Sequence, residues 1–119
     1  MIFKILTLPQ WETLQATHKF TGSADDKRDG FVHLSMGAQI QGTLDKHYSF
    51  AKTGGEDLVL AAFEPSAFGD ELKYEVSRGG DKFPHLYAAL PLSALTNHWI
   101  LQLGTNDGYE APNIIKEID

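Results

Sequence analysis

The amino-acid sequence predicts an α+β domain with a mostly antiparallel β-sheet. Two segments in the first half carry apolar residues at helical spacing, and the second half alternates apolar and polar residues over short stretches. The connections between these later stretches are too short for the crossovers that parallel strands need. We therefore expect two N-terminal helices that pack against an antiparallel or split sheet.

The expected elements follow from local patterns along the chain. Residues 2–7 are apolar and β-branched, as strands are, and Thr7 with Gln10 forms a capping box at the start of a helix. The apolar run at 57–63 has strand length and should be buried on both faces. The expected strands are 2–7, 30–35, 57–63, 72–77, 83–90 and 97–103, the expected helices lie at 8–18 and within 36–50, and 20–29 is expected to be a polar loop.

Length and composition indicate one globular domain. The chain has 119 residues, 42% of them hydrophobic, which is enough to build a core. We expect a single domain over residues 1–103, followed by a polar C-terminal tail over 104–119 that is poorly fixed.

Charge and motif content exclude several classes of function. The net charge of −6 argues against non-specific binding of nucleic acid, which would favour a basic chain. No apolar run is long enough to span a membrane, and the start is too short for a signal peptide, so a cytoplasmic location is expected. There is no cysteine, no metal-ligand spacing, and no P-loop, Rossmann or hydrolase-elbow motif, so no metal site is expected.

The stretch 75–90 (EVSRGGDKFPHLYAAL) concentrates residues that can do chemistry. Folding 72–77 onto 83–90, with RGGDK as the loop, places side chains opposite one another on one face. The simplest register pairs Ser77 with Phe83, Glu75 with His85, and Lys73 with Tyr87. A carboxylate beside an imidazole favours the protonated ring. A solvated Glu–His pair in an ordinary hairpin is the competing interpretation.

The loop of this hairpin and the strand at 30–35 add further candidates. The amides of Gly79 and Gly80 could turn towards an anion beside Arg78, although a Gly-Gly pair between strands is more often only a turn. His33 and Ser35 share one face of the strand at 30–35. Two polar residues on one face of a short strand indicate a cleft rather than core, so a functional role for His33 is as well supported as a structural one.

Four motifs resemble a known family. They are GS at 22–23, DGFVHLS at 29–35, DLVL at 57–60 and SRGGDKFPHLYAALPL at 77–92, and they resemble domain of unknown function 952. The resemblance runs from Ile2 to Leu95. The family has no established activity, and its fold is similar to the ADP-ribosyltransferase superfamily, whose split sheet forms a cleft for NAD.

This resemblance implies roles for particular residues. Lys4 stands where that superfamily places a ribose-binding His, and Glu75 would stabilise positive charge on the ribose. His33 and Ser35 would position the ribose, and His85 would move a proton. The candidate catalytic residues are therefore Glu75, His85 and His33, and the candidate ligand-binding residues are Lys4, Ser35, Ser77, Arg78, Gly79, Gly80 and Tyr87.

Three functions remain open at this point. The first is an ADP-ribosyltransferase-like domain that binds NAD, as a substrate, or a related nucleotide, with transferase or hydrolase activity. The second is a non-catalytic module that binds a nucleotide or metabolite in the same cleft. The third is a structural or protein-interaction domain in which the motif only stabilises the hairpin. The sequence does not fix an oligomeric state.

Overall fold

The computed structural model describes residues 1–115, and for Arg78 its backbone only. The chain is α+β, and every strand pair among the described residues is antiparallel. The elements are β1 (Ile2–Thr7), α1 (Leu8–Thr17), β2 (Lys19–Phe20), α2 (Ala24–Asp29), β3 (Val32–His33), α3 (Ile40–His47), α4 (Phe50–Thr53), β4 (Leu58–Phe63), β5 (Leu72–Val76), β6 (Lys82–Leu86), β7 (Leu90–Pro91) and β8 (Leu95–Leu101).

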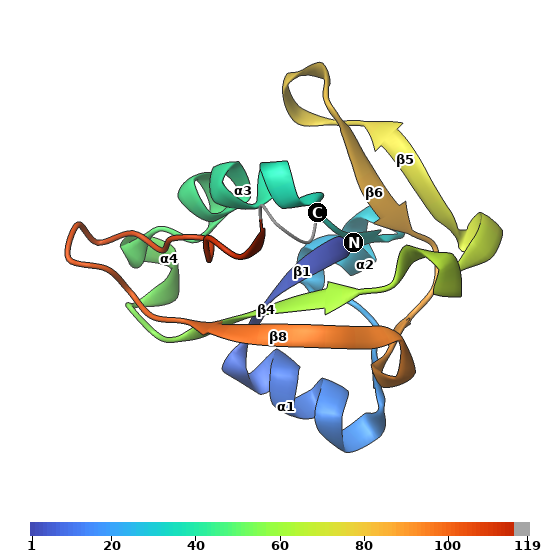
Figure 1. Cartoon of the computed structure of the whole chain (residues 1–119), viewed down its shortest axis with the longest axis horizontal. Helices are drawn as coiled ribbons and strands as arrows, with labels where there is room; N and C mark the ends of the chain where they lie inside the picture. The colour runs from blue at the N-terminus through green and yellow to red at the C-terminus, as the bar shows by residue number, and fades with distance from the viewer. Residues whose placement is uncertain (116–119) are drawn as a thin grey trace.

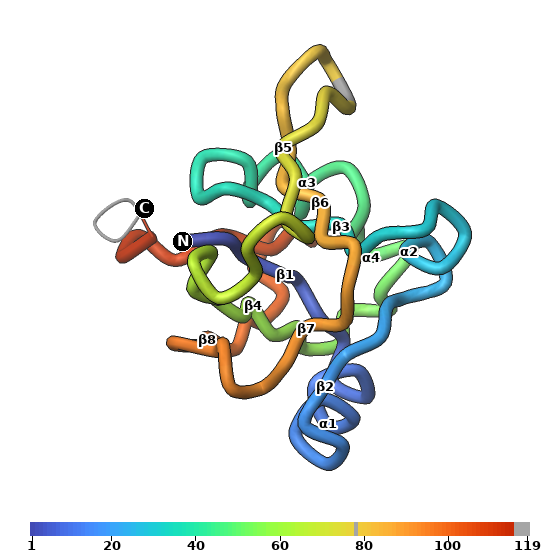
Figure 2. The backbone as a smooth tube through the Cα atoms, turned by 90° about the vertical axis from the view of Figure 1, so that its right-hand side faces the viewer, coloured from blue at the N-terminus to red at the C-terminus, as the bar shows by residue number. Residues whose placement is uncertain are grey.

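The strands form two three-stranded sheets and one short pair. The first sheet has the order β1-β4-β8, the second has the order β3-β6-β5, and β2 pairs with β7. A bridge between Phe3 and Ser35 connects β1 to the chain just after β3, and so brings the two larger sheets together. The β5–β6 hairpin projects from one end of the domain and α1 lies at the other end (Figures 1 and 2).

The β1-β4-β8 sheet carries core on both faces because its strands alternate between two apolar clusters. Ile2 and Leu6 of β1 belong to the cluster that includes Trp11 of α1. Phe3 of β1 belongs to the cluster that includes Leu44 of α3. Every residue of β4 is buried, which confirms the expectation of a strand covered on both faces.

The helical content is larger than the sequence predicted. The capping box of Thr7 and Gln10 begins α1 as expected. The polar-loop assignment of 20–29 was wrong, because Ser23 and Asp26 form a second capping box that begins α2. The helix expected within 36–50 is divided into a 3₁₀ turn, α3 and α4. The two-helix description therefore omitted α2 and α4.

The register expected for the hairpin was also wrong. Glu75 lies opposite Phe83, and Lys73 lies opposite His85, so the pairing is shifted by two residues. The cause is a tighter loop: the Ser77 N–H donates to the Asp81 carbonyl oxygen at 2.9 Å and encloses only Arg78–Gly80. Gly79 and Gly80 have φ values of 66° and 83°, which glycine adopts without strain.

The segment after β8 is anchored rather than loosely fixed as its polarity suggested. Tyr109 and Ile115 are buried in the cluster that also contains Leu44. The Gln41 side chain donates to the Tyr109 carbonyl oxygen and accepts from the Ala111 N–H, both at 2.9 Å. Residues 116–119 of the expected tail lie outside the described residues. Within residues 1–115, no helix has the length and apolar character required to cross a membrane.

Candidate functional site

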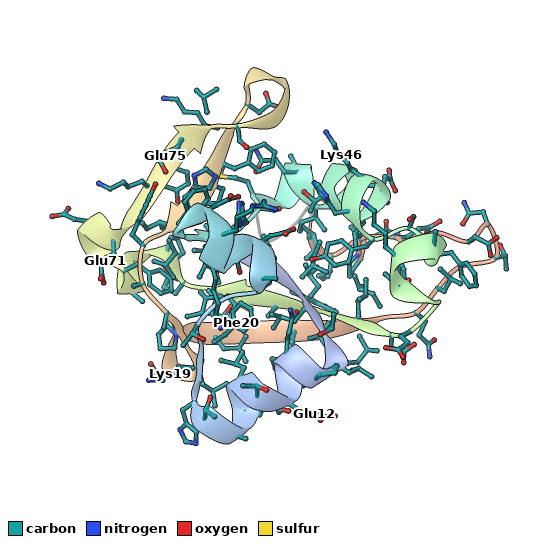
Figure 3. The ribbon with its side chains drawn as sticks, turned by 180° about the vertical axis from the view of Figure 1, so that it is seen from behind. Glu12, Lys19, Phe20, Lys46, Glu71 and Glu75 are labelled. Carbon is teal, nitrogen blue, oxygen red and sulfur yellow. The ribbon has the colours of Figure 1, made fainter. Side chains whose placement is uncertain are left out.

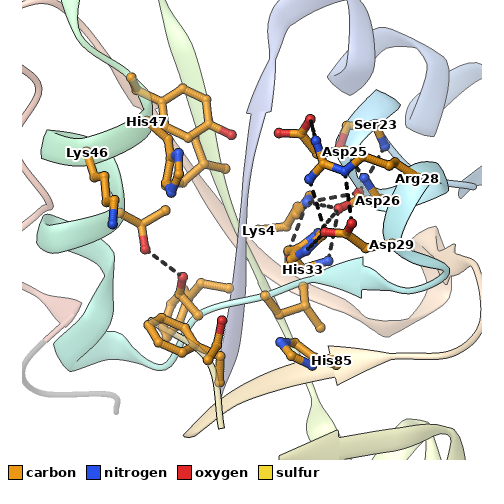
Figure 4. A pocket seen from close by; sticks show the side chains of 18 residues that line it. Lys4, Ser23, Asp25, Asp26, Arg28, Asp29, His33, Lys46, His47 and His85 are labelled. Atoms are coloured by element: carbon orange, nitrogen blue, oxygen red, sulfur yellow. Dashed lines mark hydrogen bonds and ion pairs between the residues drawn. The ribbon is translucent and has the colours of Figure 1, made fainter. Parts of the chain in front are cut away.

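A cavity of about 350 Å³ lies between α2, β1, β3, β6 and α3. Five of the residues proposed from sequence line it: Lys4, His33, Ser35, Ser77 and His85. Figure 4 shows α2, with its carboxylates, on one side of the cavity and α3, with Lys46 and His47, on the other. The α2 wall thus presents carboxylates, two of which pair with Arg28, and Lys46 brings a positive charge to the α3 wall.

Asp26 organises the α2 wall. Its Oδ2 and Oδ1 accept from Lys4 Nζ at 3.0 and 3.2 Å, and its Oδ1 also lies 2.6 Å from His33 Nδ1. The backbone N–H groups of Ser23 and His33 donate to the same carboxylate at 2.9 and 3.0 Å. Asp26 is buried, and these bonds use both of its oxygens, so its role is to hold the wall together.

The protonation of this buried pair follows from its contacts. Burial alone would raise the pKa of the Asp26 carboxyl, but the hydrogen bond from His33 and the charge of Lys4 outweigh burial, and the pKa lies well below its ordinary 3.8. Burial lowers the pKa of the Lys4 ammonium more than Asp26 raises it. Lys4 Nζ also donates to the His33 carbonyl oxygen at 2.9 Å, so its three N–H groups all have acceptors.

His33 lies between two carboxylates. Its Nδ1 faces Asp26, and its Nε2 lies 2.9 Å from Asp29 Oδ2. Both ring nitrogens can donate at once only when the imidazole is protonated. Arg28 Nε donates a hydrogen bond to Asp29 Oδ1 at 2.9 Å. This hydrogen bond is the main reason that the pKa of Asp29 is lowered.

His85 lies beside His33 on the second sheet. The two rings are 5.8 Å apart, measured between centroids, and their Cα atoms are direct partners across β3 and β6. The His85 ring is buried and stacks on Phe31 at 4.0 Å. Its Nδ1 lies 2.9 Å from Glu75 Oε1. The sequence expectation that Glu75 and His85 meet is confirmed, although across a diagonal of the hairpin.

Glu75 and Tyr87 lie behind His85 and do not line the cavity. The Tyr87 hydroxyl donates to Glu75 Oε1 at 2.7 Å. The hydrogen bonds from Tyr87 and then His85 lower the pKa of Glu75, and the bond to Glu75 raises the pKa of Tyr87. Glu75 is therefore ionised at neutral pH and contacts the cavity through His85.

The hairpin loop contributes Ser77 to the cavity but neither Gly79 nor Gly80. The Gly80 N–H donates to the Ser77 carbonyl oxygen at 3.2 Å within the turn. The side chain of Arg78 lies outside the described part of the structure.

The α3 wall contributes Lys46, His47 and Tyr48. Burial, and then the charges of Asp26 and Asp25 across the cavity, raise the pKa of the Tyr48 hydroxyl to about 12. Thr43 of the same helix lies 3.3 Å, between hydroxyl oxygens, from Ser35. This contact joins α3 to the strand residues that were proposed from sequence.

The sequence interpretation missed the charged residues that complete the cavity: Asp25, Asp26, Arg28, Asp29, Lys46 and His47. The capping box of Ser23 and Asp26 was the available signal for α2. No comparable signal marked His47, because a helical His without polar neighbours at matching spacing has no distinctive pattern. Within the described residues, no group of three or more His, Cys, Asp or Glu could hold a metal ion.

Comparison with known families identifies the one to which this chain belongs. The family model described as "Protein of unknown function (DUF952)" matches residues 5–98. The chain therefore belongs to this family, which confirms the resemblance drawn from its motifs. A search of the curated proteins finds no match.

The fold is shared with a protein of known structure. The crystal structure of protein CC0527 from Caulobacter crescentus is similar at a TM-score of 0.87 and 40% identity, with 97% of each chain covered. A solution NMR structure of CC0527 is similar at a TM-score of 0.78 and 40% identity, covering 98% of this chain and 94% of that chain. The architecture therefore extends over nearly the whole length of both chains.

Proposed function

We propose that the cavity binds a nucleotide of the NAD or ADP-ribose type and that the domain transfers or hydrolyses its ribosyl group. The observation that carries this proposal is the cavity itself. It collects Lys4, His33, Ser35, Ser77 and His85 from separate parts of the chain into about 350 Å³. That volume lies within the usual range of small-molecule sites, roughly 300–1,000 Å³. The choice of nucleotide rests on the resemblance of the family fold to ADP-ribosyltransferases.

The two walls suit the two ends of such a ligand. Lys46 and His47 face the cavity from α3, and Lys46 supplies positive charge for a pyrophosphate. Asp25 and Asp29 face it from α2, where a cationic nicotinamide or the ribose hydroxyls would lie. Lys4 also lines the cavity, but its N–H groups are directed at Asp26 and the His33 carbonyl. We assign Lys4 to holding the wall.

The proposed chemistry balances without a further reagent. The bond between the ribose carbon and the nicotinamide nitrogen breaks, and nicotinamide leaves as a neutral molecule with the bonding electrons. A water or an acceptor hydroxyl forms the new carbon–oxygen bond and releases one proton. Positive charge grows on the ribose during cleavage, and the carboxylates that line the cavity stabilise it. Glu75 does not line the cavity, so its contribution passes through His85.

A non-catalytic function remains the second candidate. The same cavity could bind a nucleotide or metabolite as a sensor. One specific observation favours this function. Asp26 forms hydrogen bonds with Lys4 and His33 in the α2 wall, so these polar groups already have partners within the protein. Binding without turnover would support it.

Nicotinamide release separates these candidates. The protein is incubated with NAD, free nicotinamide is measured by chromatography, and binding of NAD and ADP-ribose is measured by calorimetry. We expect binding that Lys46→Met weakens at least several-fold, with turnover of NAD. Lys27→Met is the matched control, because Lys27 lies on α2, is exposed and does not line the cavity. Equal affinities of both variants and the wild type would contradict the proposed site.

A further inference from the structure

We propose that His85 is the proton-accepting residue of the cavity, and that Glu75 and Tyr87 fix its ring in the tautomer whose Nε2 is open to the cavity. The inference deepens the proposed function, on which it rests for the reacting group. It rests on the contacts among three side chains: Glu75 of β5, His85 of β6, and Tyr87, which follows β6.

The contact at Nδ1 sets the tautomer of His85. A neutral imidazole carries one N–H, and a carboxylate can only accept, so the Glu75 contact at 2.9 Å places that hydrogen on Nδ1. Nε2 is then the acceptor of the ring. Among the described residues, no hydrogen-bond partner is assigned to Nε2, while His85 lines the cavity. The ring thus has a basic nitrogen where a ligand would lie.

The surroundings keep the ring in this orientation. His85 is only 5% exposed, and its ring stacks on Phe31 with an angle of 23° between the planes. Glu75 Oε1 also accepts from the Tyr87 hydroxyl at 2.7 Å, so Tyr87 fixes the carboxylate that fixes the imidazole. The side chains of Glu75 and Tyr87 are partly accessible to solvent, and Figure 3 labels Glu75 beside β5. We therefore describe Glu75 and Tyr87 as positioning residues.

His33 is excluded from this role by its own contacts. Its Nδ1 faces Asp26 at 2.6 Å and its Nε2 faces Asp29 at 2.9 Å, so a carboxylate already occupies the hydrogen-bonding position of each ring nitrogen. Of the two histidines that meet on the second sheet, only His85 has a nitrogen available as an acceptor within the described residues. Besides Glu75, Lys73 is a charged residue next to His85 on this sheet, because it is the direct partner of His85 on β5.

The step itself is a general-base transfer. As the oxygen of a water or hydroxyl attacks the ligand, its O–H bond breaks and an N–H bond forms at Nε2 of His85. The resulting imidazolium is stabilised by the Glu75 carboxylate, which keeps its own charge. Removal of such a base slows turnover by about 10²–10⁴-fold in typical enzymes.

The tautomer of His85 is measured directly by ¹⁵N NMR of the imidazole ring, without any ligand. In the wild type we expect the neutral ring to carry its hydrogen on Nδ1. Glu75→Ala should shift the neutral ring towards the Nε2–H form. Glu75→Gln should restore Nδ1–H, because the amide oxygen can accept from it. Glu71→Ala is the control, because Glu71 precedes β5 and makes no side-chain contact with His85 among the described residues.

An Nε2–H tautomer in the wild type, or a tautomer that Glu75→Ala leaves unchanged, would overturn the inference. The backbone amide spectrum of each variant shows whether it is folded, and the wild-type measurement decides the question even if Glu75→Ala is not. If NAD does not bind while His85 carries Nδ1–H, the proposed function fails together with the proton transfer to His85, and only the assigned tautomer survives. If NAD is cleaved, His85→Asn should reduce the turnover rate by at least 100-fold and leave NAD affinity within about threefold.

Discussion

The Glu75 carboxylate lies 2.9 Å from Nδ1 of His85, although the two residues occupy diagonal rather than opposite positions of the β5–β6 hairpin. A long side chain can bridge such a diagonal, which separates Cβ atoms by about 7–8 Å or somewhat less. Lys73 occupies the position directly opposite His85, and Glu75 reaches His85 from the position opposite Phe83. This geometry makes Glu75 a support for His85 from outside the cavity.

Replacement of Asp26 by Asn should destabilise the protein strongly. The change leaves Lys4 buried without its counter-charge, and breaking one partner of a buried pair costs about 3–5 kcal/mol. Urea unfolding measures this loss. Asp25→Asn is the control on the same helix, because its ion pair with Arg28 is exposed and should contribute about 1 kcal/mol or less. A loss below about 1 kcal/mol for Asp26→Asn would show that Asp26 does not organise this wall.

Acidification should remove the stability that the ionised Asp26 carboxylate contributes. Its pKa is lowered in the folded state, so the unfolded chain takes up the proton first, and the stabilisation is complete above the ordinary value of 3.8. It is lost as pH falls below that value and through the lower folded pKa, at up to about 1.4 kcal/mol per pH unit. The ¹³C shift of the Asp26 carboxyl should stay constant as pH falls past 3.8. A titration midpoint at or above 3.8 would contradict the assigned contacts.

Tyr87→Phe should raise the pKa of Glu75. The hydroxyl of Tyr87 is the largest cause of its lowered value, and the bond to His85 is the next, so the pKa should move part of the way back towards 4.5. A ¹³C titration of the Glu75 carboxyl measures the change. Tyr74→Phe is a suitable control, because Tyr74 is exposed on β5 and no hydrogen bond of its hydroxyl is found among the described residues. An unchanged pKa in Tyr87→Phe would exclude Tyr87 as a support for Glu75.

Tyr109→Phe should weaken the attachment of the segment after β8. The buried Tyr109 hydroxyl contacts Thr53 Oγ1 at 2.8 Å and the Glu56 carbonyl oxygen at 2.5 Å. Its removal should cost about 1 kcal/mol, the usual net contribution of a hydrogen bond, because both contacts are only partly buried. Urea unfolding gives the global loss, and faster amide exchange near residue 109 would locate it. Stability equal to the wild type would mean that the segment is held by apolar packing alone.

Patterns that depend on immediate neighbours predicted the framework well. Thr7 and Gln10 marked the start of α1 because a capping box is formed within four residues. The run 57–63 indicated a doubly covered strand because no polar residue within Leu58–Phe63 offered a solvent face. Alternation also grouped His33 with Ser35, and Glu75 with His85, on the correct faces.

Features that alternation leaves open, or that depend on distant contacts, could not be predicted in this way. The register of the hairpin was set by the Ser77–Asp81 bond, which shortens the loop, and a shift of two residues preserves the alternation on which the prediction relied. Asp26 becomes a central residue only through Lys4, which is 22 positions away in the sequence. The segment 20–29 looked like a loop because its charged side chains gave no sign that one of them was buried.

The central claim is that the cavity binds a nucleotide, and titration of ¹⁵N-labelled protein with NAD and ADP-ribose tests it most directly. We expect saturable shifts of the backbone amides at His33, Ser35, Ser77 and His85, in or next to the strands that border the cavity, and at Lys46 and His47 of α3. Lys46→Met should weaken these shifts, and Lys27→Met should not. No shifts at millimolar ligand, or shifts scattered away from the cavity, would contradict the claim.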